Sequence, residues 1–150
     1  MADFMETILG SKLRKALMLS ESIAWYESFD NELKRIILDY IQKDQLTNQG
    51  VDEDGDIIGL YSDFTESINP EKIAGTPYTL DDTGDFYKSM YIVVLQDSIV
   101  IEADPIKGED NLFYKYGESI IGLTEENLER LREEIKKRYI KFVKKSLEID

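Results

Sequence analysis

Acidic side chains are the residues of this 150-residue chain whose type and spacing could do chemistry. Four of them surround a glycine in Asp52-Glu53-Asp54-Gly55-Asp56, a composition found in calcium-binding loops. An EF-hand loop needs oxygen ligands at positions one, three and five, glycine at six and glutamate at twelve. With Gly55 at position six, the first and twelfth residues are Gly50 and Tyr61, and starting the loop at Asp52 also fails. The segment is therefore predicted to be an acidic turn without a specific metal.

A second group of carboxylates, Asp81, Asp82 and Asp85, lies beside Gly84. Two carboxylates can serve as acid and base in a hydrolase, but one of them must be buried to raise its pKa, and no pattern here predicts that. The chain has no histidine and no cysteine. Disulfides, Cys/His zinc sites, thiol nucleophiles and Ser-His-Asp triads are thereby excluded. We expect no cofactor and no enzymatic activity.

The negative charge is concentrated in the middle of the chain. The net charge is −13, and residues 44–123 hold seventeen acidic and four basic side chains, whereas both flanks are nearly neutral. Such a segment is either a solvated face or a surface that repels nucleic acid or meets a basic partner. No apolar run is long enough for a transmembrane helix, and we expect no secretory leader and no membrane association.

The N-terminal third is predicted to be helical. From Phe29 to Ile41 the apolar residues recur at spacings of three and four, with Ser28 or Asp30 able to cap the helix start. This helix should end in the polar stretch that closes on Gly50. Residues 1–28 form a helical arm or a first helix, and the pattern leaves open whether they make one helix or two.

A small, mostly antiparallel sheet is predicted in the middle. The β-branched runs 90–95 and 98–103 indicate a β-hairpin, with additional short strands at 57–61 and 112–116 and a loop at 62–82. Before the hairpin, Phe86 and Met90 lie one helical turn apart and could face a core.

The last helix is predicted at about 125–147. Thr124 is a suitable N-cap, and Leu123 and Leu128 occupy the positions of a hydrophobic staple. Glutamates lie in its first turns and lysines in its last turns, as the helix dipole favours. The predicted fold class is α+β, with residues 29–150 as one domain after the helical residues 1–28.

Two aromatic groups are candidates for interface anchors because tyrosine and tryptophan favour half-buried contact surfaces. They are Trp25-Tyr26 and Phe113-Tyr114. Core packing is an equally good explanation of both groups.

The order of these segments resembles that of small neck proteins of tailed bacteriophages, the tail-completion or head–tail connector group. Many members carry a T-G-x-[LF]-x-x-S-[IM] segment before a β-hairpin, then a Y-x-x-x-G stretch and a C-terminal helix. The resemblance covers roughly residues 30–150 and is to versions from phages and prophages of Bacteroidetes-type hosts. The positions that carry it are Thr83, Gly84, Phe86, Met90, Tyr116 and Gly117.

The resemblance implies a structural virion protein, made in the host cytoplasm and seated in the neck between portal and tail. Its partners would be further copies of itself, in rings that typically hold six or twelve, and portal or adaptor and tail proteins. DNA would pass without specific binding, along a wall that includes Asp52, Asp54, Asp81 and Asp82, because like charge repels the duplex. The alternative is a free acidic binding protein, such as an inhibitor or a DNA mimic.

Overall fold

A computed structural model describes residues 23–146. Residues 23–28 are helical, and the α-helix α2 (Asn31–Asp39) follows after a short break. Asp30 caps α2, because its side chain accepts a hydrogen bond from the backbone N–H of Leu33 at 2.7 Å. This confirms the predicted helix and shows that, of the two predicted caps Ser28 and Asp30, it is Asp30 that caps it. Whether residues 1–28 make one helix or two lies largely outside the described residues, and the division at residue 28 stays a prediction.

The helix continues from α2 as the π-helix η2 (Tyr40–Gln49). Its buried residues are Tyr40, Ile41, Gln45 and Leu46. The buried pair 40–41 thus recurs five residues later as the pair 45–46, whereas an α-helix repeats every three or four residues. An α-helical spacing would instead turn the polar residues Asp44 and Asn48 towards the core. The wider turn therefore buries Leu46, and it also buries the polar side chain of Gln45. The helix ends at Gly50, as predicted, with the left-handed angles φ 64° and ψ 37°.

Two small antiparallel sheets follow, each of two strands. Strands β1 (Tyr91–Val94) and β2 (Ile99–Glu102) form the predicted hairpin, with Ile92 opposite Ile101. Strands β3 (Ile106–Lys107) and β4 (Asp110–Asn111) form a second, very short one. The predicted strand at 57–61 is wrong, since only single bridges from Ile57 to Val51 and from Leu60 to Pro77 form there.

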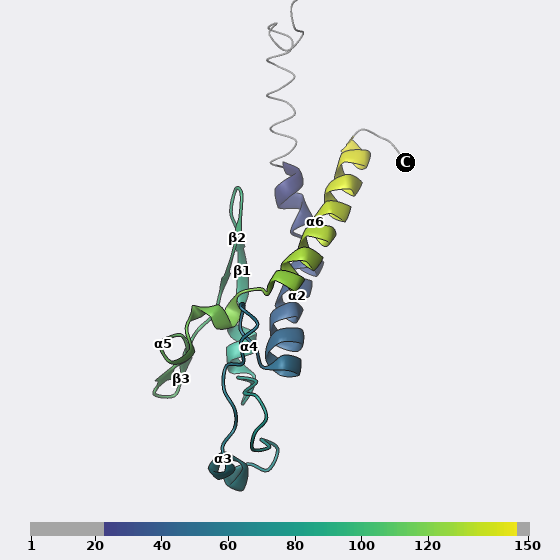
Figure 1. The fold of residues 1–150 in the computed structure, drawn as a ribbon. Coiled ribbons are helices and arrows are strands. Elements are labelled where there is room, and N and C mark those ends of the chain that lie inside the picture. The colour runs from purple at the N-terminus through teal and green to yellow at the C-terminus, as the bar shows by residue number, and fades with distance from the viewer. Residues whose placement is uncertain (1–22, 147–150) are drawn as a thin grey trace, which may run out of the picture.

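Residues 61–76 project from the rest of the chain (Figure 1) and form the arm, a segment distinct from the helical arm predicted at residues 1–28. Its ends are joined because Tyr61 N donates to Thr76 O and Gly75 N donates to Tyr61 O, each at 2.9 Å. The short helix α3 (Asp63–Ile68) lies at its tip, where the sequence predicted only a loop (Figure 1). Ser62 caps α3 by accepting from the backbone N–H of Thr65.

The segments around the hairpin are helical. Helix α4 (Asp85–Ser89) precedes β1, and Phe86 and Met90 are both buried, as predicted. The predicted strand at 112–116 is wrong, because these residues form helix α5 (Leu112–Tyr116). The Asn111 side chain accepts the N–H groups of the second and third residues of α5, which starts a helix instead of extending β4. A 3₁₀ helix, η3 (Glu118–Ile121), leads into the last helix.

Helix α6 (Glu125–Ser146) confirms the predicted C-terminal helix. Its cap is Thr124, whose hydroxyl accepts from Asn127 N at 3.3 Å. Arg130 joins α6 to η2, through an ion pair with Asp44 at 2.6 Å and by lying over the Tyr40 ring. No described helix combines the length and apolar character needed to cross a membrane.

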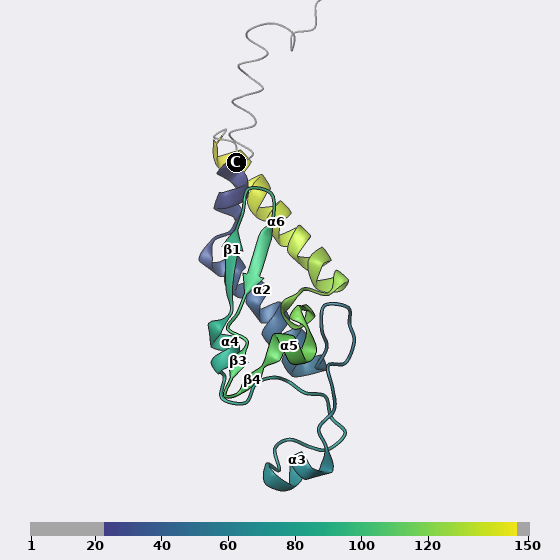
Figure 2. The ribbon, with the colours of Figure 1, turned by 90° about the vertical axis from the view of Figure 1, so that its left-hand side faces the viewer.

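These elements pack into two adjoining clusters. Helix α2 packs with the inner face of the β1–β2 hairpin and with α6, and η2 packs with α4, α5 and η3. The hairpin tip and the C-terminal end of α6 point to one end of the molecule, while α3 lies at the other end (Figures 1 and 2). The described chain is thus a mixed α+β structure, as predicted, drawn out between two dissimilar ends.

Candidate functional site

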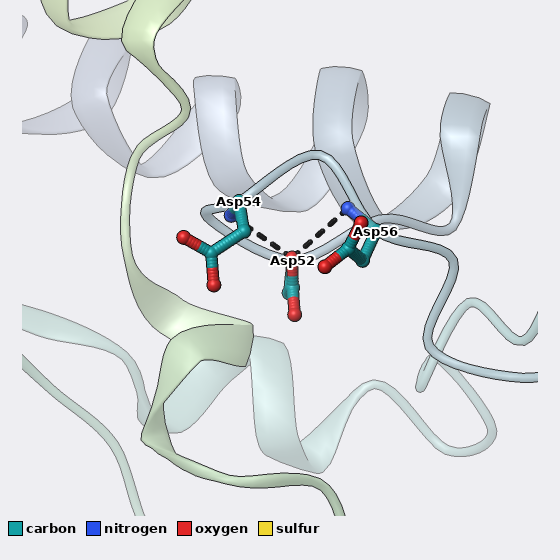
Figure 3. A group of neighbouring side chains, drawn as sticks. All are labelled: Asp52, Asp54 and Asp56. Carbon is teal, nitrogen blue, oxygen red and sulfur yellow. Dashed lines mark hydrogen bonds between the residues drawn. The ribbon is translucent and has the colours of Figure 1, made fainter.

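The acidic turn 52–56 is organised around the Asp52 carboxylate. It accepts hydrogen bonds from the backbone N–H groups of Asp54 at 2.9 Å and Asp56 at 3.1 Å (Figure 3). Its second oxygen accepts from the Ser119 hydroxyl at 3.3 Å. The turn also closes through backbone bonds from Asp52 N to Asp56 O and from Gly55 N to Asp52 O, and Glu53 N donates to Ser119 O of η3. The Asp52 side chain therefore acts first as a clamp for the backbone.

The same turn brings three carboxylates together. Ligand oxygens of Asp52, Asp54 and Asp56 lie within 4.8 Å of one another. Asp54 and Asp56 are exposed, whereas Asp52 is half-buried and already bonded to backbone donors. Partial loss of hydration and the charges of Asp54 and Asp52 raise the pKa of the neighbouring Glu53 carboxyl. These residues could hold a hard cation only with ligands from elsewhere, because calcium takes six to eight oxygens.

The clamp predicts unequal effects of three alanine substitutions. Asp52→Ala should cost about 1.5 kcal/mol of unfolding free energy, since it removes three hydrogen bonds to a charged acceptor. Asp54→Ala and Asp56→Ala remove exposed carboxylates and should stay within about 0.5 kcal/mol of the wild type. Urea unfolding followed by fluorescence of Trp25, the one tryptophan, measures all three. Equal losses in the three variants would contradict the clamp.

The other predicted acidic pair lies near the base of the arm. Asp82 pairs with Lys107 of β3 at 2.9 Å and with Lys72 of the arm at 3.1 Å. Hydrogen bonds from Lys107 and Lys72 lower the pKa of Asp82. Asp81 is exposed beside it. The four residues predicted to line a DNA channel therefore lie on two separate segments, and the charge of Asp82 is balanced by two lysines. Their place on a channel wall stays a prediction.

A pocket of about 460 Å³ opens between the arm and the β3–β4 hairpin. Its charged lining holds both lysines and aspartates, and its aromatic lining comes from Tyr61, Tyr78 and Tyr116. Tyr61 and Tyr78 meet edge to face at 4.9 Å, and Tyr78 meets Tyr116 at 6.1 Å. The rings thus tie the base of the arm to α5, and the pocket has the character of a packed joint.

The positions that carry the family resemblance have structural roles. Gly84, at φ 81°, precedes α4, and Gly117, at φ 87°, ends α5. Thr83 accepts from Asp85 N at 3.4 Å, while Phe86 and Met90 are buried in one core cluster. Tyr116 packs beside the same cluster. The residues of the motif therefore start helix α4 and end helix α5.

Of the four aromatic interface candidates, two contribute to packing within the chain. Trp25 meets Phe29 edge to face at 4.7 Å and donates its indole N–H to Leu95 O at 2.6 Å. Phe113 packs against Phe86 at 6.3 Å. By contrast, Tyr26 is 46 % exposed and Tyr114 is 93 % exposed. The interface role of all four residues stays a prediction. Tyr26 and Tyr114 have the exposed surface that an interface needs.

Tyr87 joins η2 to the segment after the arm. Its hydroxyl donates to Thr79 O and lies 3.2 Å from the Thr47 hydroxyl oxygen. Burial raises the pKa of Tyr87 from 10.0 to about 12.

The raised pKa of Tyr87 predicts a loss of stability in alkali. Above pH 10 the unfolded chain loses this phenolic proton before the folded chain does. The contribution of the protonated Tyr87 hydroxyl to the unfolding free energy is therefore complete below pH 10 and is lost as the pH rises towards 12. The unfolding free energy of Tyr87→Phe should fall less than that of the wild type over this range. Tyr114→Phe, at an exposed ring, is the matched control and should follow the wild type. Parallel curves for wild type and Tyr87→Phe would contradict the assignment.

Sequence reasoning missed the exposed apolar side chains of the two projecting elements. On the arm these are Phe64 and Ile68 of α3, which are 73 % and 70 % exposed, with Ile73 nearby in sequence. On the outer face of the hairpin they are Tyr91, Val93 and Val100. The spacing of four between Phe64 and Ile68 was the available signal, hidden by the loop prediction for 62–82.

Comparison with protein-family models, with curated proteins and with solved structures gives no match to this chain.

Proposed function

We propose that this chain is a non-catalytic structural protein of the tailed-phage neck, which joins a ring of its own copies between the portal and the tail. The proposal takes the assignment to a virion from the sequence resemblance carried by residues 83–90 and 116–117. Assembly through exposed surfaces is inferred from the arm and the β1–β2 hairpin, the two elements that project from the molecule (Figure 1).

The observation that carries assembly is the apolar surface that the arm and the hairpin expose. Exposed apolar patches mark interaction sites, and each of these two projecting elements carries more than one exposed apolar side chain. The β1–β2 sheet has only two strands among the described residues, so both of its edges can accept a further strand. Surfaces of this kind suit a protein whose function is to make contacts.

The charge pattern is compatible with DNA passing nearby. The segment that contains the arm and the 52–56 turn is strongly acidic, and acidic surfaces repel the phosphate backbone. Asp54 and Asp81 are exposed and have no ion-pair partner within 4 Å among the described residues. In a ring whose lumen they face, such carboxylates would let the duplex slide without holding it.

The test is the mass of the full chain in solution together with its abundance in purified phage particles. We expect rings or smaller assemblies in solution, and a fixed copy number in particles, consistent with six or twelve. A monomer or dimer that is absent from particles would contradict the proposal. That result would favour a free acidic binding protein, for which competition with DNA for a basic partner is the next measurement.

A further inference from the structure

We propose that copies of this protein join head to tail, with the arm of one copy docked on the C-terminal half of α6 of the next. The inference deepens the proposed function, on which it rests for the expectation that the chain assembles with itself. It follows from two surfaces that match in apolar character, have opposite charge, and lie at opposite ends of the molecule.

The arm presents an apolar centre with an acidic surround. Phe64 and Ile68 are four residues apart in α3, so they lie on one face of that helix. Both are highly exposed, and Asp63 and Glu71 are exposed acidic residues close by in sequence. The wider segment 51–85 holds ten acidic side chains and one lysine, and that lysine is paired with Asp82.

The C-terminal half of α6 presents an apolar centre with a basic surround. Ile140 is 43 % exposed, and Lys136 and Lys144 lie one helical turn before and after it. Residues 136–145 hold six basic side chains and no acidic one. Lys137 and Arg138 pair with Glu134 of their own helix. No described carboxylate lies within 4 Å of the ammonium groups of Lys136, Lys141, Lys144 or Lys145.

The two surfaces cannot satisfy each other within one chain, because α3 and the C-terminal end of α6 lie at opposite ends of the molecule in both views (Figures 1 and 2). A second copy brings its own arm to the basic helix face. Apolar contact would then exclude water at the centre, while opposite charges at the rim orient the approach. An interface between two different surfaces of the same chain is heterologous, and such interfaces close into rings or extend into filaments.

Site-specific crosslinking of full-length chains tests this contact, because the natural chain has no cysteine to interfere. Ser67→Cys places a thiol on α3, and Lys137→Cys places one beside Ile140; both positions are exposed and leave the apolar centres intact. The two single variants, carrying tags of different mass, are mixed at low salt and treated with a short bismaleimide. We expect a crosslinked dimer that contains one chain of each kind.

Two controls make the result specific. Pairing Ser67→Cys with Glu109→Cys, an exposed site in the β3–β4 turn, should give no dimer above background. Adding Phe64→Ser to the arm variant, or Ile140→Ser to the helix variant, should lower the yield at least about tenfold, with circular dichroism showing that each chain remains folded.

Three outcomes would overturn the inference: no mixed dimer, links only between identical positions, or a yield unchanged by Phe64→Ser and Ile140→Ser. If the link is missing while particles contain the protein at a fixed copy number, the docking contact fails and the neck function stands. If the link forms but particles lack the protein, the contact stands and the neck function fails.

Discussion

Gly50→Ala is expected to cost at least about 3 kcal/mol of unfolding free energy. Gly50 ends η2 with φ 64°, a conformation that costs an alanine roughly 1–2 kcal/mol. A β-carbon there would also collide with the Pro77 side chain and would lie 2.9 Å from Tyr78 O. Both neighbours belong to the segment that returns from the arm, which cannot move away while Tyr78 N stays bonded to Gly59 O at 2.7 Å.

The matched control is Gly55→Ala. Gly55 has φ 80°, so alanine meets a similar backbone cost, but no atom lies within 4 Å of the place that its β-carbon would take. We expect a loss of only about 1 kcal/mol there. Urea unfolding of the two variants and the wild type separates the steric contribution from the conformational one. Equal losses in Gly50→Ala and Gly55→Ala would show that the segment returning from the arm, at Pro77 and Tyr78, does not press on the end of η2.

Gly50 also illustrates how much of the fold the sequence could predict. The helix end at this glycine, a cap at Ser28 or Asp30, the β1–β2 hairpin and α6 were all predicted from local signals. Each depends on residues close together in the chain, through capping, turn formation or helical periodicity. The close approach of Pro77 to Gly50 depends on how the arm folds back, which local patterns do not encode.

Helix α5 shows why the prediction of a strand at 112–116 was wrong. Leu112, Phe113 and Tyr116 face the core while Tyr114 is exposed, which is a helical pattern five residues long. Over so short a segment of apolar residues, strand and helix patterns are hard to separate. The cap from Asn111 decided the outcome, and it was available in the sequence.

The candidate site was predicted least well. Two of the acidic residues predicted to line a DNA channel act as clamps: Asp52 holds its own turn, and Asp82 ties Lys72 to Lys107. The docking surfaces on α3 and on the C-terminal half of α6 left only a weak trace in the sequence, the spacing of four between Phe64 and Ile68. These surfaces matter because their apolar side chains are exposed and because they lie at opposite ends of the molecule (Figures 1 and 2). Both properties depend on the fold and not on local sequence.

The π-helix η2 is the other feature that local patterns missed. Its wide turn buries Gln45 completely, and the side chain is met by three polar groups. The amide nitrogen donates to Gly122 O at 2.8 Å, and the amide oxygen accepts from Thr124 N at 2.9 Å and from the Asn127 side chain at 2.8 Å. One residue of η2 thus holds the entry to α6.

Gln45→Leu should therefore cost about 3 kcal/mol, although leucine suits the apolar surroundings and nearly matches the volume. The buried partners would lose their hydrogen bonds, and each unpaired buried group costs about 1–3 kcal/mol. Gln49→Leu, at an exposed position of the same helix, is the matched control and should stay within about 0.5 kcal/mol of the wild type. Equal stability of Gln45→Leu and wild type in urea would mean that apolar packing alone joins η2 to α6. A large loss confined to Gln45→Leu would mean that the buried amide fixes the register between them.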